Sequence, residues 1–97
     1  MEKQIKIPIQ AINNAKTALI ANYIYKNNKC ATAVGKKRAL QIINDKYLSY
    51  QTALRTFSYL SRAKTYDQND WEKCGTISFN LWGGDEMLQY LKKILKK

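Results

Sequence analysis

CGTISFNLWGGDEMLQYLKKILKK, residues 74–97, is the stretch that decides the fold. An apolar run ends in Trp82, a pair of glycines follows, and an amphipathic pattern starts again at Asp85. Glycines supply the left-handed backbone conformation at which helices commonly end. The stretch therefore predicts a helix over residues 74–82 and another from Asp85, joined by a tight corner. Periodicity alone also leaves a strand open for residues 74–82, because this run is rich in side chains that favour strands.

Three more segments upstream of this corner predict helices from their apolar spacing and their caps. Residues 8–26 begin with a proline, which suits a first helical turn. Thr32 and Ser49 are good N-caps for helices over residues 33–44 and 50–64. Together with the C-terminal pair, these segments predict an all-α fold, a compact single-domain bundle of four to five short helices.

The domain organisation follows from the same pattern. Residues 1–7 alternate loosely and predict a short extended N-terminal arm ahead of a helical domain over residues 8–97. Within residues 33–44 we expect an apolar side and an outward basic side. The expected apolar side consists of Ala33, Val34, Leu40 and Ile43, with Ile42 beside them. The clearest stripe lies in residues 50–64 and consists of Tyr50, Ala53, Leu54, Phe57, Leu60 and Ser61.

The two cysteines, Cys30 and Cys74, stand far apart in a chain without histidine. Two thiols cannot complete a structural zinc site, which needs four Cys or His ligands. A disulfide between them requires an oxidising compartment. We favour the interpretation that both are small buried hydrophobic residues.

Sequence features of an enzyme are missing. The absence of histidine removes the commonest general base at neutral pH. The chain contains no GxSxG, P-loop, GxGxxG or HExxH motif. Asp67, Asp70 and Glu72 cluster beside an expected helix start, where capping explains them better than metal binding. The sequence predicts a non-enzymatic protein without cofactor, metal or small-molecule substrate.

No apolar run approaches the roughly 20 residues that a membrane span needs. The N-terminus also lacks the apolar core of a signal peptide. We therefore expect a soluble intracellular product with no membrane partner.

The net charge of +10 is unevenly distributed. Residues 1–64 hold twelve Lys or Arg against two acids, whereas residues 65–91 hold one Lys against five acids. Such a basic chain should seek polyanions or an acidic protein face, although AT-rich coding could also contribute lysines. The candidate anion- or partner-binding residues are Lys36, Lys37, Arg38, Arg55, Arg62, Lys92 and Lys93.

The corner itself consists of Trp82, Gly83, Gly84 and Asp85. A structural interpretation is complete without any function: the indole closes the core, the glycines permit the turn, and the aspartate caps the next helix. Arg62 could bond carbonyls at the end of its own helix or a carboxylate near residue 67.

Two segments carry a family resemblance: LRTFSYLSRAKTY (residues 54–66) and CGTISFNLWGGDEMLQYLKKIL (residues 74–95). The match extends over residues 14–95 and resembles a small helical domain of tailed-bacteriophage proteins. That domain occurs alone or fused to head-maturation proteases and other head-gene products. Gln89 and Tyr90 depart from the pattern, and residues 1–10 match nothing in it.

The resemblance implies a helix rather than a strand over residues 74–82, and a phage head context without a catalytic activity. It favours an auxiliary or minor capsid protein of the phage head. This protein would be made in the host cytoplasm and would bind the major capsid protein or other virion proteins through its basic surface.

Two other function classes stay open. The first is a helix-turn-helix-like DNA-binding protein, with residues 36–44 and 49–64 as its helices and an exposed reading face. That face would consist of Gln51, Thr52, Arg55 and Thr56. The second is a phage effector that inhibits a host protein.

Overall fold

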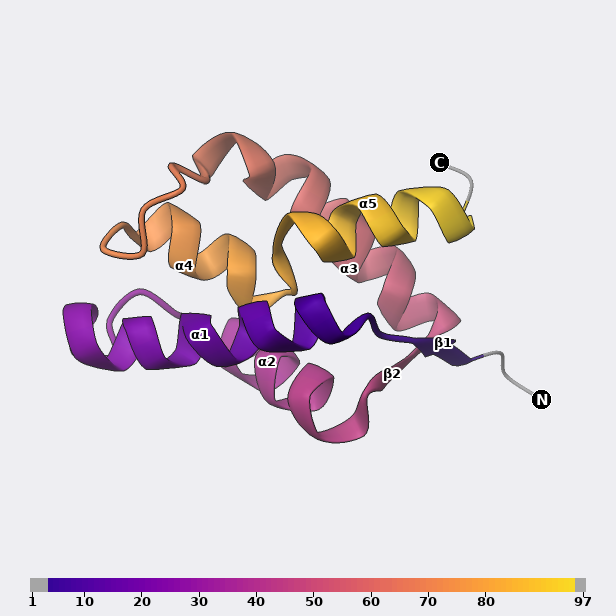
Figure 1. Ribbon diagram of the computed structural model, residues 1–97, viewed down its shortest axis with the longest axis horizontal. Helices are drawn as coiled ribbons and strands as arrows, with labels where there is room; N and C mark the ends of the chain where they lie inside the picture. The colour runs from indigo at the N-terminus through magenta and orange to yellow at the C-terminus, as the bar shows by residue number, and fades with distance from the viewer. Residues whose placement is uncertain (1–3, 96–97) are drawn as a thin grey trace.

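The computed structural model describes residues 4–95, and 74% of its residues are helical (Figure 1). The helices are α1 (Ile9–Lys26), α2 (Ala33–Asp45), α3 (Tyr50–Ala63), α4 (Cys74–Leu81) and α5 (Gly84–Leu95). Two short strands, β1 (Gln4–Lys6) and β2 (Tyr47–Ser49), and a 3-10 turn, η1 (Lys64–Tyr66), complete the described elements. The predicted all-α fold class is confirmed, and so are the five helices to within two residues at each end.

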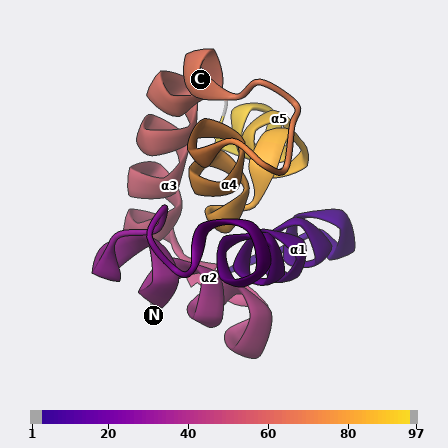
Figure 2. The same cartoon turned by 90° about the vertical axis from the view of Figure 1, so that its left-hand side faces the viewer.

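Helix α4 lies at the centre of the molecule. It contacts each of the other four helices, with α1 and α2 on one side and α3 and α5 on the other (Figures 1 and 2). Thr76, Ile77, Phe79, Asn80 and Leu81 of this helix are buried. Since a helix surrounded by others must be apolar on most sides, the run shows no clear amphipathic period. This explains why periodicity left strand and helix open for residues 74–82.

Helix α1 packs mainly through alanines. Ala11, Ala15, Ala18 and Ala21 are all buried, and small side chains allow α1 to approach α4 closely. Of its bulky residues Ile12 is also buried, whereas five others are more than half exposed: Ile9, Ile20, Tyr23, Ile24 and Tyr25.

The predicted apolar side of α2 is wrong in part. Val34 and Leu40 are 60% and 50% exposed, and Ala33 is also exposed. Ile42 is buried and Ile43 packs against the core, as predicted. The face that packs on α1 and α4 contains Gly35 and Ala39 beside Ile42, because small side chains let the helices approach closely. Helix α3 matches its predicted stripe only in part: Ala53 and Leu60 are buried, whereas Tyr50 and Ser61 are exposed.

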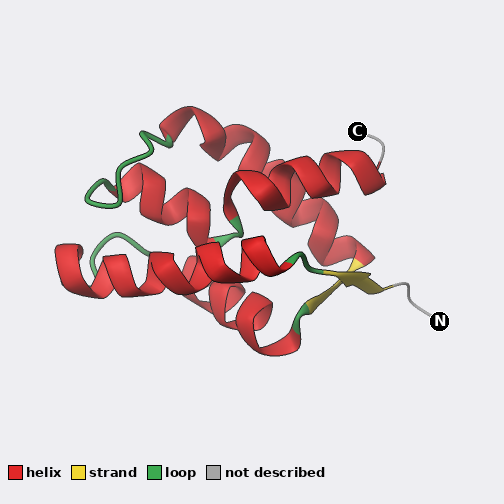
Figure 3. Cartoon of the chain, viewed as in Figure 1, coloured by secondary structure: helices red, strands yellow, loops and turns green. Residues whose placement is uncertain are grey.

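A two-stranded antiparallel sheet ties the start of the chain to the segment between α2 and α3 (Figure 3). Ile5 pairs with Leu48, and both side chains are buried. Ile7 is also buried, and its N–H donates to the carbonyl of Lys46 at 3.0 Å. Residues 1–3 of the expected arm lie outside the described residues, and its remainder is an integral part of the core.

The two cysteines form a disulfide, so the interpretation of both as buried thiols is wrong. Cys30 and Cys74 lie 44 residues apart in sequence, with their Cα atoms 5.1 Å apart. Cys30 is half-buried and Cys74 is exposed. Packing of α4 against α1 and α2 brings the start of α4 to the α1–α2 connection, a proximity that the separation in sequence does not reveal.

Two of the helix starts, those of α2 and α3, follow the capping rules. The Thr32 and Ser49 hydroxyls accept hydrogen bonds from the N–H groups of Gly35 and Thr52, as expected for N-caps. The predicted cap of the last helix is wrong, because α5 begins at Gly84 and the Asp85 carboxylate is bonded to side chains instead. No helix within residues 4–95 has both the length and the hydropathy to cross a membrane.

Candidate functional site

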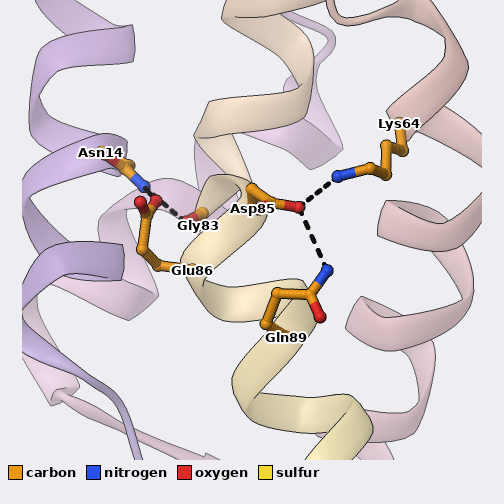
Figure 4. Close-up of polar contacts among 6 residues, drawn as sticks. All are labelled: Asn14, Lys64, Gly83, Asp85, Glu86 and Gln89. Atoms are coloured by element: carbon orange, nitrogen blue, oxygen red, sulfur yellow. Dashed lines mark hydrogen bonds and ion pairs between the residues drawn. The ribbon is translucent and has the colours of Figure 1, made fainter.

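The Trp82–Asp85 corner is held by polar contacts from two other helices (Figure 4). The Asn14 amide of α1 donates to the Gly83 carbonyl at 2.9 Å and to the Glu86 carboxylate at 2.6 Å. On the opposite side, Lys64 forms an ion pair with Asp85. Gly83 and Gly84 have φ angles of +110° and +72°, which L side chains rarely adopt. The corner is therefore a rigid junction of α1, α3, α4 and α5.

Trp82 is the aromatic centre of this junction and is 8% exposed. The Tyr59 ring of α3 stacks on it, with ring centroids 4.2 Å apart and 18° between the planes. The Arg38 guanidinium of α2 lies over the indole, 5.2 Å from the ring centroid, within the range of a cation–π interaction. Three helices thus meet on one indole ring.

Two further arginines belong to the same face as Tyr59. Arg55, Tyr59 and Arg62 are spaced four and three residues apart, which places them on one side of α3. Both arginines are exposed. We call these two arginines, together with Arg38 over the indole of Trp82, the arginine cluster (Arg38, Arg55, Arg62).

The charges of this face affect the pKa values of Arg38 and Tyr59. Burial lowers the pKa of Arg38, and the nearby charge of Arg55 lowers it further. Burial raises the pKa of Tyr59, while the charge of Arg62 and a hydrogen bond with Ser78 act in the opposite direction. The Arg38 Nε is buried and has no hydrogen-bond partner among residues 4–95. An anion at this face would therefore offset mutual repulsion of the guanidinium groups.

A pocket of about 270 Å³ opens beside the aromatic pair. Its walls come from the N-terminus of α2, from Tyr59 and from α4, and include Thr32, Ser78 and Leu81. The Ser78 hydroxyl also donates to the Cys30 carbonyl at 3.3 Å. The pocket therefore combines hydroxyl groups with apolar walls.

The seven predicted binding cations do not form one surface. Three of them belong to the arginine cluster. Lys37, in contrast, lies on the outer face of α2 beside Leu40. Lys36 is half-buried and lies two positions before Arg38, on a different side of α2. The exposed Lys92 and Lys93 lie near the end of α5, where Ile94 shares a depression with Tyr50 at the start of α3. Arg62 is at the other end of α3, so these lysines are separate from the cluster.

The helix-turn-helix arrangement is absent from the described residues. Helix α2 packs on α1 and α4, whereas α3 packs on α5 and α4, and strand β2 lies between the two helices in sequence. Thr56 of the expected reading face is completely buried and donates to the Thr52 carbonyl at 2.8 Å. A recognition helix needs this face free to enter a groove.

The acidic turn before α4 has a structural role. The Asp67 and Asp70 carboxylates accept hydrogen bonds from the N–H groups of Asn69 and Glu72, so they cap turns rather than a helix. Within residues 4–95, neither expected partner of the Arg62 side chain is bonded to it.

Comparison of the chain with models of protein families, with curated proteins and with solved structures finds no match.

The sequence did not predict the roles of two residues at this site, Tyr59 and Asn14. Tyr59 stands between Arg55 and Arg62 at helical spacing, a signal that could have identified it. Asn14 is a polar residue on the small-residue face of α1, and its partners lie 69 and 72 residues away. Only the packing of α1 against the corner reveals its contacts.

Proposed function

We propose that this protein is a non-enzymatic auxiliary protein of a tailed-phage head, which binds an acidic surface of the capsid shell. The arginine cluster is the single observation that carries the proposal. Arg38 lies over Trp82 of the stacked aromatic pair, and Arg55 and Arg62 are exposed on the side of α3 that carries Tyr59. Guanidinium groups bind carboxylates in a bidentate manner, and exposed arginines are typical anchors of protein interfaces.

Two further observations support this proposal. The resemblance of residues 14–95 to a phage head-associated domain supplies the context. The Cys30–Cys74 disulfide lies at the surface. Disulfides persist on virion surfaces and are rare in the reducing cytosol. We therefore favour the outer face of the shell, which meets an oxidising medium after release of the virion.

Mass spectrometry of purified virions tests the location. We expect many copies per particle, with Cys30 and Cys74 joined. Complete absence from virions, together with tight sequence-selective binding to duplex DNA, would support the DNA-binding alternative. Absence from virions combined with capture of one host protein would support an inhibitory effector.

Uptake of the purified protein by shells that lack it tests the binding surface. The double variant Arg55→Glu with Arg62→Glu reverses two charges of the cluster and should strongly reduce uptake. Lys16→Glu with Lys92→Glu makes the same change in net charge at exposed lysines outside the cluster and should leave most uptake intact. Equal losses of uptake in both variants would show that uptake depends on net charge rather than on the arginine cluster.

A further inference from the structure

Among residues 4–95, strand β1 has an open edge. The Ile7 N–H donates to the Lys46 carbonyl, and the register pairs Ile5 with Leu48 two residues earlier. Backbone groups of an antiparallel strand point alternately toward and away from the partner strand, so those of Ile5 point toward β2 and those of Gln4 and Lys6 point away from it. Outside the β1–β2 ladder, no backbone hydrogen bond within residues 4–95 involves Gln4 or Lys6.

Two apolar depressions follow this edge. One, of about 220 Å³, lies between Gln4, Ile5 and Lys6 on one side and Tyr90 and Ile94 of α5 on the other. Successive strand side chains alternate between faces, so a depression lined by three consecutive residues runs along the edge of the strand.

The second depression continues the first. It has a volume of about 290 Å³ and is lined by Lys6, Ile7, Pro8, Ile9 and Tyr90. Lys6 and Tyr90 line both depressions, so the two form one groove along residues 4–9. Ile9 is 76% exposed and Ile94 is 39% exposed at its two ends.

The groove has a basic character. Lys6 lines it throughout, and Lys93 lies on α5 one position before Ile94. None of the side chains that line either depression is acidic. The nearest carboxylate of α5 in sequence is Glu86, which is bonded to Asn14. An acidic segment would therefore complement the charge of this groove.

We infer that this groove binds an extended, acidic segment of another protein chain, which adds to the sheet as a third strand beside β1. The backbone groups of Gln4 and Lys6 supply the pairing, as in other peptide complexes formed by strand addition. Alternate apolar side chains of the segment enter the depressions on either side of Tyr90, and its carboxylates face Lys6 and Lys93. The inference is independent of the arginine cluster.

A synthetic peptide that alternates glutamate and valine, with blocked ends and a fluorescent label, is the probe. We expect saturable binding by anisotropy, and protection of the Lys6 amide from hydrogen exchange when the peptide is bound. The same peptide with lysine in place of glutamate should not bind. Absence of saturable binding of the glutamate peptide, or equal binding of both, would overturn the inference.

Two substitutions at one position separate backbone pairing from charge. Lys6→Ala keeps the edge N–H and should weaken binding only modestly, whereas Lys6→Pro removes this N–H and should weaken it by about tenfold. Proline is tolerated on the free side of an edge strand. If circular dichroism shows that Lys6→Pro is unfolded, hydrogen exchange of the wild-type Lys6 amide decides the question. Protection of this amide by the bound peptide supports strand addition, and lack of protection refutes it. Equal affinity of the two folded variants would refute strand addition.

The test also separates this inference from the proposed head function. The variant Arg55→Glu with Arg62→Glu should bind the peptide as wild type does, because its substitutions lie on the outer face of α3. Loss of peptide binding in that folded variant would show that the peptide occupies the arginine cluster, and would overturn the assignment to the groove.

Discussion

Trp82 is the residue at which α2, α3 and α4 meet, through its contacts with Arg38 and Tyr59. Trp82→Ala should destabilise the fold by about 3–5 kcal/mol, because it removes a buried indole and leaves a cavity. Urea denaturation followed by circular dichroism measures this loss. Trp71→Ala is the matched control. Trp71 is only half-buried, so its replacement should lower the free energy of unfolding by less. A Trp82→Ala protein as stable as wild type would refute the role of Trp82 in the core.

Asp85 gives the stability of the corner a dependence on pH. Its hydrogen bond with Lys64 holds the pKa of Asp85 below the ordinary value of 3.8. A lowered folded-state pKa stabilises the fold above the unfolded-state pKa, and this contribution is lost as pH falls through the folded-state value. The side chains are 47% and 51% exposed, so solvent screening limits the pair to about 0.2–1 kcal/mol.

Asp85→Asn should therefore lower the free energy of unfolding at neutral pH, and the difference from wild type should shrink as pH falls below the ordinary pKa of 3.8. Added salt should reduce the difference at neutral pH. Glu72→Gln changes the charge equally at an exposed carboxylate and serves as control. A difference that persists in acid would show that Asp85 acts by packing rather than by charge.

At the scale of elements, α1 shows that the spacing of large apolar residues need not mark the packed face. The alanine face reaches α4, while Ile20 and Ile24 remain outside. Ala15→Leu should destabilise the protein by about 1–3 kcal/mol through overpacking. Ile24→Ala should change stability by less than about 0.5 kcal/mol, as expected for an exposed position.

Urea denaturation of the two α1 variants measures both effects. A larger loss for Ile24→Ala than for Ala15→Leu would mean that α1 packs through its bulky side.

At the scale of the whole molecule, the disulfide closes a loop of 44 residues that contains α2 and α3. Loop-closure entropy predicts a stabilisation of about 4 kcal/mol for this length. Replacing both Cys30 and Cys74 by serine should lower the free energy of unfolding by about this amount. Reduced wild type should match the double variant in urea denaturation. Two free thiols in the air-oxidised native protein, counted by thiol titration, would contradict the bond.

The sequence by itself determined the bounds of the helices. Its caps at Thr32 and Ser49, the glycine pair and the local apolar spacing predicted four of them, because helix starts and ends depend on residues within a turn of each other. For residues 74–82 the apolar spacing left helix and strand open, and the family resemblance indicated a helix. It also identified the cations of the arginine cluster, although it placed them on one surface with lysines that lie elsewhere.

Only the tertiary structure decided which faces pack and which distant residues meet. The disulfide, the pairing of Ile5 with Leu48, and the contacts of Asn14 all join residues more than 40 positions apart. No local pattern encodes such pairs. The disulfide and the contacts of Asn14 follow from packing α4 and the corner against α1 and α2, whose buried faces consist mainly of small side chains together with Ile12 and Ile42. Most other large apolar residues of these two helices are left exposed.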